Sequence, residues 1–231
     1  MKRGDLVWAA ALLSVVALFA APATREVLIG ATRAHPYGMG FLKFAVLASM
    51  GELLAIRVVT GEWKAPAGLP YRAIVWGLIG SALALIFPVV SAGIAAASSA
   101  GLLPSLPGPL GEKVSRAFWI SAVKNLTWAP TLMLAHRLTD TWLDLAGGRL
   151  SAVSSIPVAK VAATIDWNGF IGFVLFRTIP LFWIPAHTFT FLLPPELRII
   201  FAAFLSVALG AILAFAKRRG AVEARSRAVG A

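Results

Sequence analysis

The chain has 231 residues, of which 59% are hydrophobic and 13% charged, with no cysteine and a formal net charge of +11. Soluble domains have about 45–50% apolar and about 25% charged residues, so this composition excludes an ordinary soluble domain. The lack of cysteine excludes disulfides and cysteine-ligated metals. Most Lys and Arg residues flank long apolar runs, which is typical of a multi-span membrane protein and does not indicate a nucleic-acid partner. The lipid bilayer is the expected partner, with anionic lipids contacting the basic loops.

The first apolar segment covers residues 6–21. Lys2 and Arg3 precede it, and Ala21-Pro22-Ala23 follows it, so the segment also resembles a secretory signal with an A-x-A cleavage site. The apolar run is long for the core of a signal, and we therefore expect a retained span. The prediction is six spans, or five if the first segment is cleaved.

Five further apolar segments are each long enough to cross a bilayer as a helix. They cover residues 41–59, 73–97, 117–138, 168–193 and 197–216. The runs are continuous and do not alternate with polar residues, which favours helices over a membrane barrel. No loop is long enough for a separate soluble domain. We predict an all-α, polytopic transmembrane helical bundle that forms a single membrane domain over residues 1–231.

The basic residues between the segments predict the orientation. With six spans, the N-terminus, the second and fourth loops and the C-terminus lie on one side, and this side carries most of the loop Lys and Arg residues. The positive-inside rule then places both termini in the cytoplasm.

Small residues line one face of two segments. Ala202, Ser206, Gly210 and Ala214 recur every four positions on the last one, and Ala48 and Ala55 flank Glu52 on the same face of the second. Small residues allow helix backbones to approach closely within a bilayer. This favours packing within the chain over a dedicated dimerisation face, although a homo-oligomer stays open.

Three ionisable residues lie within otherwise apolar segments: Glu52, Lys124 and Arg177. A charge at the centre of a membrane helix costs about 2.5–3.5 kcal/mol, so each needs a partner or water. Helical rise places them roughly 16, 10 and 24 Å from the non-cytoplasmic face, so Glu52 can pair with Arg177 or with Lys124. Asn125 and His187 are near the depth of Lys124 and extend this predicted polar centre.

Three interpretations of the polar centre stay open. The charges form a buried ion pair that fixes helix register, they line a water-filled pore or proton path, or they snorkel to the interface. Metal binding is not predicted, because the three histidines lack companion carboxylates at ligand spacing. The sequence has no P-loop, G-x-G-x-x-G or G-x-S-x-G motif, so we predict neither a cofactor nor an enzyme.

The fifth and sixth segments contain an aromatic and proline pattern formed by Trp183, His187, Phe191 and Pro195. This pattern resembles the C-terminal signature of the Mpv/PMP family of peroxisomal and mitochondrial inner-membrane proteins. The family usually has Gln at the position of His187 and Asn at the position of Thr190, so the chain departs from the signature there.

Two upstream elements extend the resemblance. Gly51-Glu52 resembles a Gly-Asp pair in an early span of the family, and Lys124-Asn125 followed by Pro130 resembles its Lys, Asp-Gln and Pro element. The resemblance covers roughly residues 41–216 and implies a small, multi-span, channel-forming protein. The Ala-rich composition fits a prokaryotic relative in the cytoplasmic (inner) membrane.

The leading hypothesis is therefore a channel or transporter-like pore lined by Glu52, Lys124 and Arg177. The alternative is a structural or assembly subunit of a larger membrane complex, in which the buried charges only fix helix register.

Overall fold

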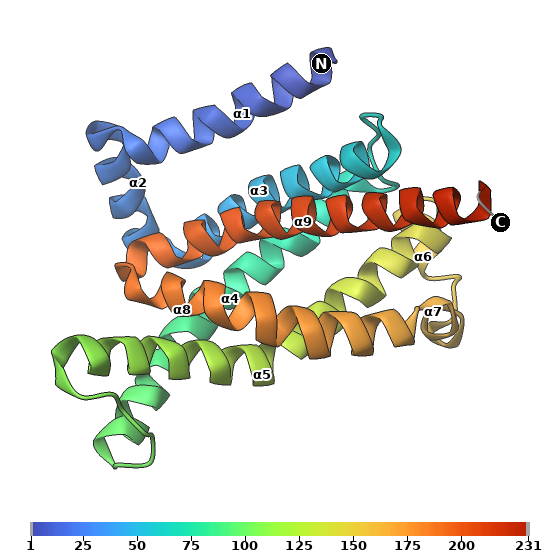
Figure 1. Cartoon of the computed structure of the whole chain (residues 1–231). Helices are drawn as coiled ribbons and strands as arrows, with labels where there is room; N and C mark the ends of the chain where they lie inside the picture. Colours follow the sequence, from blue (N-terminus) through green and yellow to red (C-terminus); the bar gives the residue numbers. More distant parts are fainter. Residues whose placement is uncertain (1, 230–231) are drawn as a thin grey trace.

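The structure is a computed structural model that describes the backbone of residues 2–229 and the side chains of residues 2–212. Residues 2–229 form helices joined by short loops and contain no strand (Figure 1). The predicted all-α bundle is thereby confirmed. The helices are α1 (Arg3–Ala20), α2 (Pro22–Ala34), α3 (Pro36–Thr60), α4 (Leu69–Ser99), α5 (Gly108–Leu145), α6 (Leu150–Val153), α7 (Val158–Thr164), η1 (Gly169–Trp183), α8 (Ile184–Leu192) and α9 (Pro195–Val229).

Five helical segments are long and apolar enough to cross a membrane: α1, α3, α4, the continuous η1–α8 unit, and α9 as far as Ile212. The chain is therefore a membrane-embedded helical protein. The predicted fourth span lies within α5, which has 38 residues but is more polar because it carries Lys124, His136 and Asp140. The count of six spans is approximate for this reason. The membrane concerned and the side of the termini stay predictions.

Helix α3 lies in the middle of the bundle, packed between α4 and α9 (Figure 1). Glycines make both contacts close: Gly40 faces Gly80 of α4, and Gly51 faces Gly210 of α9. A Cβ added at Gly40 would lie 2.6 Å from the Gly80 carbonyl oxygen, and one at Gly210 would lie 3.0 Å from the Gly51 carbonyl oxygen. The predicted stripe of small residues on α9 thus packs within the chain, and its last member, Ala214, lies beyond the described side chains.

The apolar core lies where α3, α4, α5, α8 and α9 meet. Its members are large aliphatic and aromatic side chains that recur at helical spacing, among them Phe44, Leu47, Leu83, Phe87, Ile120, Phe191 and Ile199. Many other large apolar side chains point outward, as expected for helices surrounded by lipid. The core fixes the five helices that surround the site described below.

Helix α1 lies apart from the centre of the bundle and contains no buried residue. Its partly buried side chains Trp8, Leu12, Val15 and Phe19 pack against the apolar core, and polar contacts add to this packing. Trp8 Nε1 donates to the Met50 carbonyl oxygen at 3.0 Å, and the Asp5 carboxylate accepts from Arg57 Nε at 2.8 Å. Lys2, just before α1, pairs with Glu62 in the loop after α3. This hydrogen bond lowers the pKa of the Glu62 carboxyl group. These contacts agree with a retained first span, which stays a prediction.

Candidate functional site

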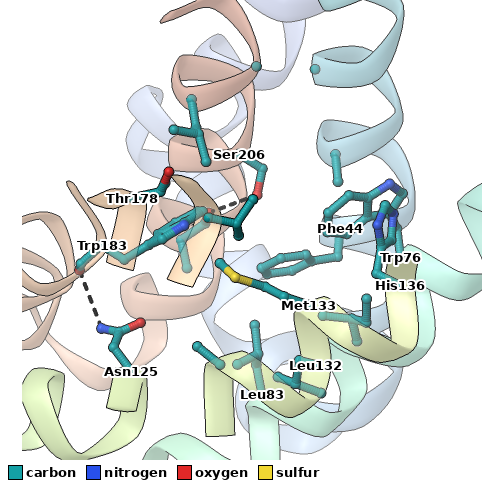
Figure 2. Close-up of a pocket in the computed structure, with 18 of the residues that line it drawn as sticks. Phe44, Trp76, Leu83, Asn125, Leu132, Met133, His136, Thr178, Trp183 and Ser206 are labelled. Carbon is teal, nitrogen blue, oxygen red and sulfur yellow. Dashed lines mark hydrogen bonds between the residues drawn. The ribbon is translucent and has the colours of Figure 1, made fainter. Parts of the chain in front are cut away.

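A half-open cavity of about 300 Å³ lies in the bundle, lined by α3, α4, α5, the η1–α8 unit and α9 (Figure 2). Four residues of the predicted polar centre border it: Glu52, Lys124, Asn125 and His187. Arg177 does not border it. The cavity therefore has polar groups near two ends and an apolar wall between them.

Arg72 is the partner of Glu52. The Arg72 side chain is buried, with 5% of its surface exposed, and its Nη1 lies 3.1 Å from Glu52 Oε1 and 2.9 Å from Asp140 Oδ1. Its Nη2 lies 2.5 Å from Asp144 Oδ1, and its Nε donates to the Ala67 carbonyl oxygen at 2.9 Å. One guanidinium thus connects α3, α4 and α5. We refer to Arg72, Glu52, Asp140 and Asp144 as the arginine network.

The pairing of Glu52 with Arg177 or Lys124 considered from sequence is not what the structure shows. The predicted apolar segment 73–97 begins after Arg72, so the sequence assigns Arg72 to the loop before it. Helix α4 begins at Leu69, so Arg72 lies in its first turn and points into the bundle. One feature of the sequence could have indicated this pairing. Asp140 and Asp144 have i, i+4 spacing, so they lie on one face of a helix and need a basic partner.

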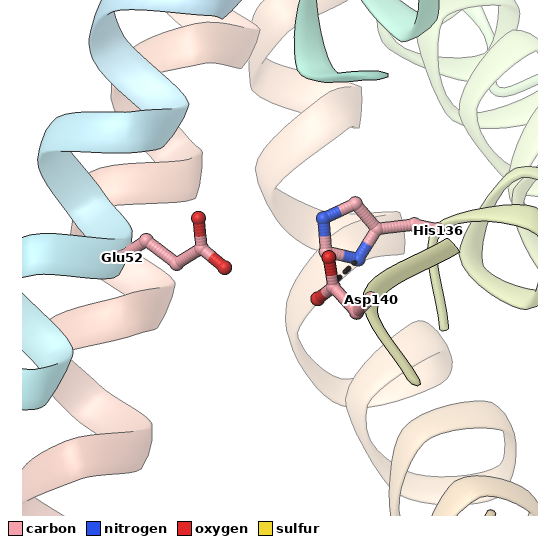
Figure 3. Close-up of side chains that lie close together, drawn as sticks. All are labelled: Glu52, His136 and Asp140. Carbon is pink, nitrogen blue, oxygen red and sulfur yellow. Dashed lines mark ion pairs between the residues drawn. The ribbon is translucent and has the colours of Figure 1, made fainter. Parts of the chain in front are cut away.

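The arginine network contains three carboxylates for one guanidinium. Glu52 Oε2 and His136 Nε2 are buried and have no hydrogen-bond partner among the described residues. Figure 3 shows Glu52 of α3 facing His136 and Asp140 of α5, whose ligand-type atoms lie within 4.8 Å of one another. Arg72 already supplies the positive charge next to Glu52 and Asp140, so the geometry favours an ion-pair network over a metal centre.

Lys124 lies near the opposite end of the cavity, between α5 and α8. It is 3% exposed, and its Nζ lies 2.9 Å from Nδ1 of His187, which is 4% exposed. Asn125 is fully buried, and its Nδ2 donates to the carbonyl oxygens of Ser121 at 2.9 Å and Trp183 at 3.3 Å (Figure 2). We refer to Lys124, Asn125, His187 and Trp183 as the lysine cluster.

The junction between η1 and α8 explains why polar residues gather there. Helix η1 has π-type hydrogen bonds, from residue i to residue i+5, and α8 returns to α-helical bonding. Pro180 and Pro185 also lack backbone donors near this change. Ser121 Oγ of α5 donates to the Ile184 carbonyl oxygen at 2.7 Å, and Asn125 donates to that of Trp183. Polar side chains of α5 therefore satisfy the carbonyls of the junction.

Arg177 is exposed on the outer surface of η1 and forms no ion pair with a described side chain. The following residues, Thr178 and Ile179, are buried, so the buried face of η1 does not include Arg177. The structure therefore separates Arg177 from the other four residues of the predicted centre. In a membrane its guanidinium would have to snorkel to the headgroups, the third of the open interpretations.

The residues of the family-like pattern occupy three places. Trp183 borders the cavity and stacks on His187, with ring centroids 5.0 Å apart and an interplanar angle of 16°. Phe191 is buried against Phe87, and Pro195 begins α9. Comparisons of the chain with protein-family models, curated proteins and solved structures found no match. The resemblance to the Mpv/PMP family stays a prediction.

Proposed function

We propose that the protein carries a small solute across its membrane through the central cavity, as a channel or transporter-like pore. The observation that carries this proposal is that one cavity borders both the buried Lys124 of α5 and the half-buried Glu52 of α3. Protein interiors are normally close-packed, with few voids larger than a water molecule. A half-open space of about 300 Å³ beside ionisable groups therefore has room for a small solute, and such a solute can supply partners for these groups.

The proposed pathway uses the lysine cluster and Glu52, and it leaves Arg177 at the outer surface. The positive-inside pattern would place both termini, and with them the arginine network near the ends of α3 and α5, on the cytoplasmic side. The resemblance to the Mpv/PMP family supports the same function, in a prokaryotic cytoplasmic membrane. The proposal needs neither a cofactor nor catalysis.

A structural or assembly subunit of a larger membrane complex is the second candidate, and the arginine network favours it. A buried guanidinium that connects three helices is what a device for fixing helix register requires. Mild detergent extraction would then recover a stable partner protein, and substitutions in the network would impair assembly without changing solute flux.

Filling the cavity tests the pore function. Ala129 of α5 borders the cavity, whereas Leu126 on the same helix is 63% exposed on the outer surface. In liposomes loaded with a small solute, Ala129→Phe is expected to lower the flux by at least about tenfold, because a tenfold lower rate needs only about 1.4 kcal/mol of extra barrier. Glu52→Gln should also change the flux.

The matched control is Leu126→Phe, which adds the same ring on the outer surface and should transport like the wild type. Gel filtration in detergent establishes that each variant is folded, and Ala129→Leu is used if Ala129→Phe is not. Equal flux for the cavity variants and the control would contradict the pore function.

A further inference from the structure

Lys124 has a buried amine without a negative partner. Its ammonium group forms no ion pair with any carboxylate of residues 2–212, and its neighbours are neutral: His187 Nδ1 at 2.9 Å and the Phe87 ring, whose centroid lies 5.6 Å away. A cation–π contact offsets only part of the cost of burying a charge. An ammonium group has three donors, and one of them is used by His187. The other two have no acceptor among the described residues.

Trp183 adds an unused donor beside His187. Its indole Nε1 is buried and has no hydrogen-bond partner among the described residues, although an indole N–H can only donate. His187 lies between the two donors, since it accepts from Lys124 and stacks on the Trp183 ring. When Nδ1 accepts from the Lys124 ammonium group, neutral His187 carries its proton on Nε2 and is itself a further donor. The lysine cluster is thus rich in donors, and it turns positive when Lys124 takes up a proton.

An anion is the complementary ligand for this cluster. A carboxylate accepts several hydrogen bonds at once and supplies the missing negative charge. The wall next to the cluster is apolar, with Phe44, Leu83, Leu132 and Met133 among the lining side chains (Figure 2). An organic anion places its hydrocarbon part against this wall, whereas an inorganic anion leaves it unfilled. The volume of about 300 Å³ suits a small molecule.

The other end of the cavity selects against a second negative charge. Glu52 borders it there, and the arginine network already has more carboxylates than guanidinium groups. The second carboxylate of a dicarboxylate would lie against the apolar wall or near Glu52, and both positions are unfavourable.

We infer that the cavity binds a small aliphatic monocarboxylate, with its carboxylate at Lys124 and Trp183 and its hydrocarbon chain against the apolar wall. This inference rests on the proposed function, because it names the class of solute that the same cavity would carry. Lys124 and Trp183 are binding residues in this arrangement, and His187 positions both.

Equilibrium dialysis of labelled hexanoate against the purified full-length protein in detergent, with empty micelles as blank, tests the inference. Wild-type protein is expected to bind hexanoate saturably. Lys124→Met keeps the length of the side chain but removes its charge and donors, and should weaken binding at least about tenfold. Trp183→Phe removes the indole N–H and should weaken it roughly 2–12-fold.

Trp76→Phe is the matched control, because Trp76 also borders the cavity with an unpaired indole Nε1, next to His136 and away from the lysine cluster. It should bind hexanoate like the wild type. Hexylamine, with the opposite charge, should not bind, and adipate, a dicarboxylate of the same length, should bind at least about tenfold more weakly than hexanoate.

Wild-type binding by Lys124→Met, equal weakening by both tryptophan variants, or binding of hexylamine or adipate as tight as that of hexanoate would overturn the inference. If Lys124→Met is not folded by gel filtration, the Trp183→Phe and Trp76→Phe pair decides. Binding is measured without a membrane. Bound hexanoate without liposome flux would therefore contradict only the pore function, and flux without saturable hexanoate binding would contradict only this inference.

Discussion

Replacing Arg72 with methionine is expected to lower the free energy of unfolding by about 3–5 kcal/mol, the usual cost of removing one partner of a buried ion pair. Methionine fills much of the same space, so the loss is electrostatic. Glu52 and Asp140 would be left facing each other in the bundle interior without a cation between them. Thermal unfolding in detergent, followed by fluorescence-detected gel filtration, measures the change in stability.

Two further variants separate the network from a general effect of charge. Arg177→Met removes an exposed guanidinium without a described partner, and it should not lower the stability. Adding Glu52→Gln and Asp140→Asn to Arg72→Met should restore part of the lost stability, because the unpaired carboxylates become neutral amides. Wild-type stability of Arg72→Met would show that the network does not hold the bundle together.

Replacing Gly80 with alanine is expected to be the second most damaging substitution, although it adds a single methyl group. The new Cβ would overlap the carbonyl oxygen of Gly40, and backbone atoms cannot move aside as a flexible side chain can. Overpacking costs about 1–3 kcal/mol or more, and here it would also separate α3 from α4. That separation would move Glu52 away from Arg72, so solute flux should change together with stability.

Gly93→Ala is the control on the same helix. A Cβ at Gly93 meets no atom within 4 Å, so only the helix propensity changes, and alanine is better than glycine by roughly 0.5–1 kcal/mol. The two substitutions should therefore have opposite signs in the same unfolding assay. A similar effect of both would contradict the close packing of α3 on α4.

Much of the fold could be predicted because continuous apolarity is a local property of the sequence. The segments 41–59 and 73–97 fall within α3 and α4, and 117–138 falls within α5. The ends were less predictable. Helix α4 begins four residues before its apolar run, and α5 continues through Pro130 to Leu145. A helix continues into polar residues where neighbouring helices supply hydrogen-bond or ion-pair partners for them. Which helices are neighbours is not visible in a local stretch of sequence.

The candidate site was predicted in part for the same reason. Depth along a helix follows from position in the sequence, so Glu52, Lys124 and His187 were correctly expected inside the bundle. The direction of a side chain depends on how each helix is rotated and wound. The π-type bonding of η1 was not readable from the sequence, and Arg177 lies on its outer surface while Trp183 and His187 reach the cavity. The role of Arg72 depends on contacts between three helices.

Cysteine labelling tests most directly whether the central cavity is accessible to solutes. The chain has no cysteine, so a single introduced thiol is the one reactive site. Ser206 borders the cavity, whereas Ser49 is buried on α3 and does not border it, and serine and cysteine are close in size. A small water-soluble methanethiosulfonate should modify Ser206→Cys in liposomes and block flux, and it should leave Ser49→Cys unmodified. A Ser206→Cys variant that is as unreactive as Ser49→Cys, or that is modified without a change in flux, would contradict the account.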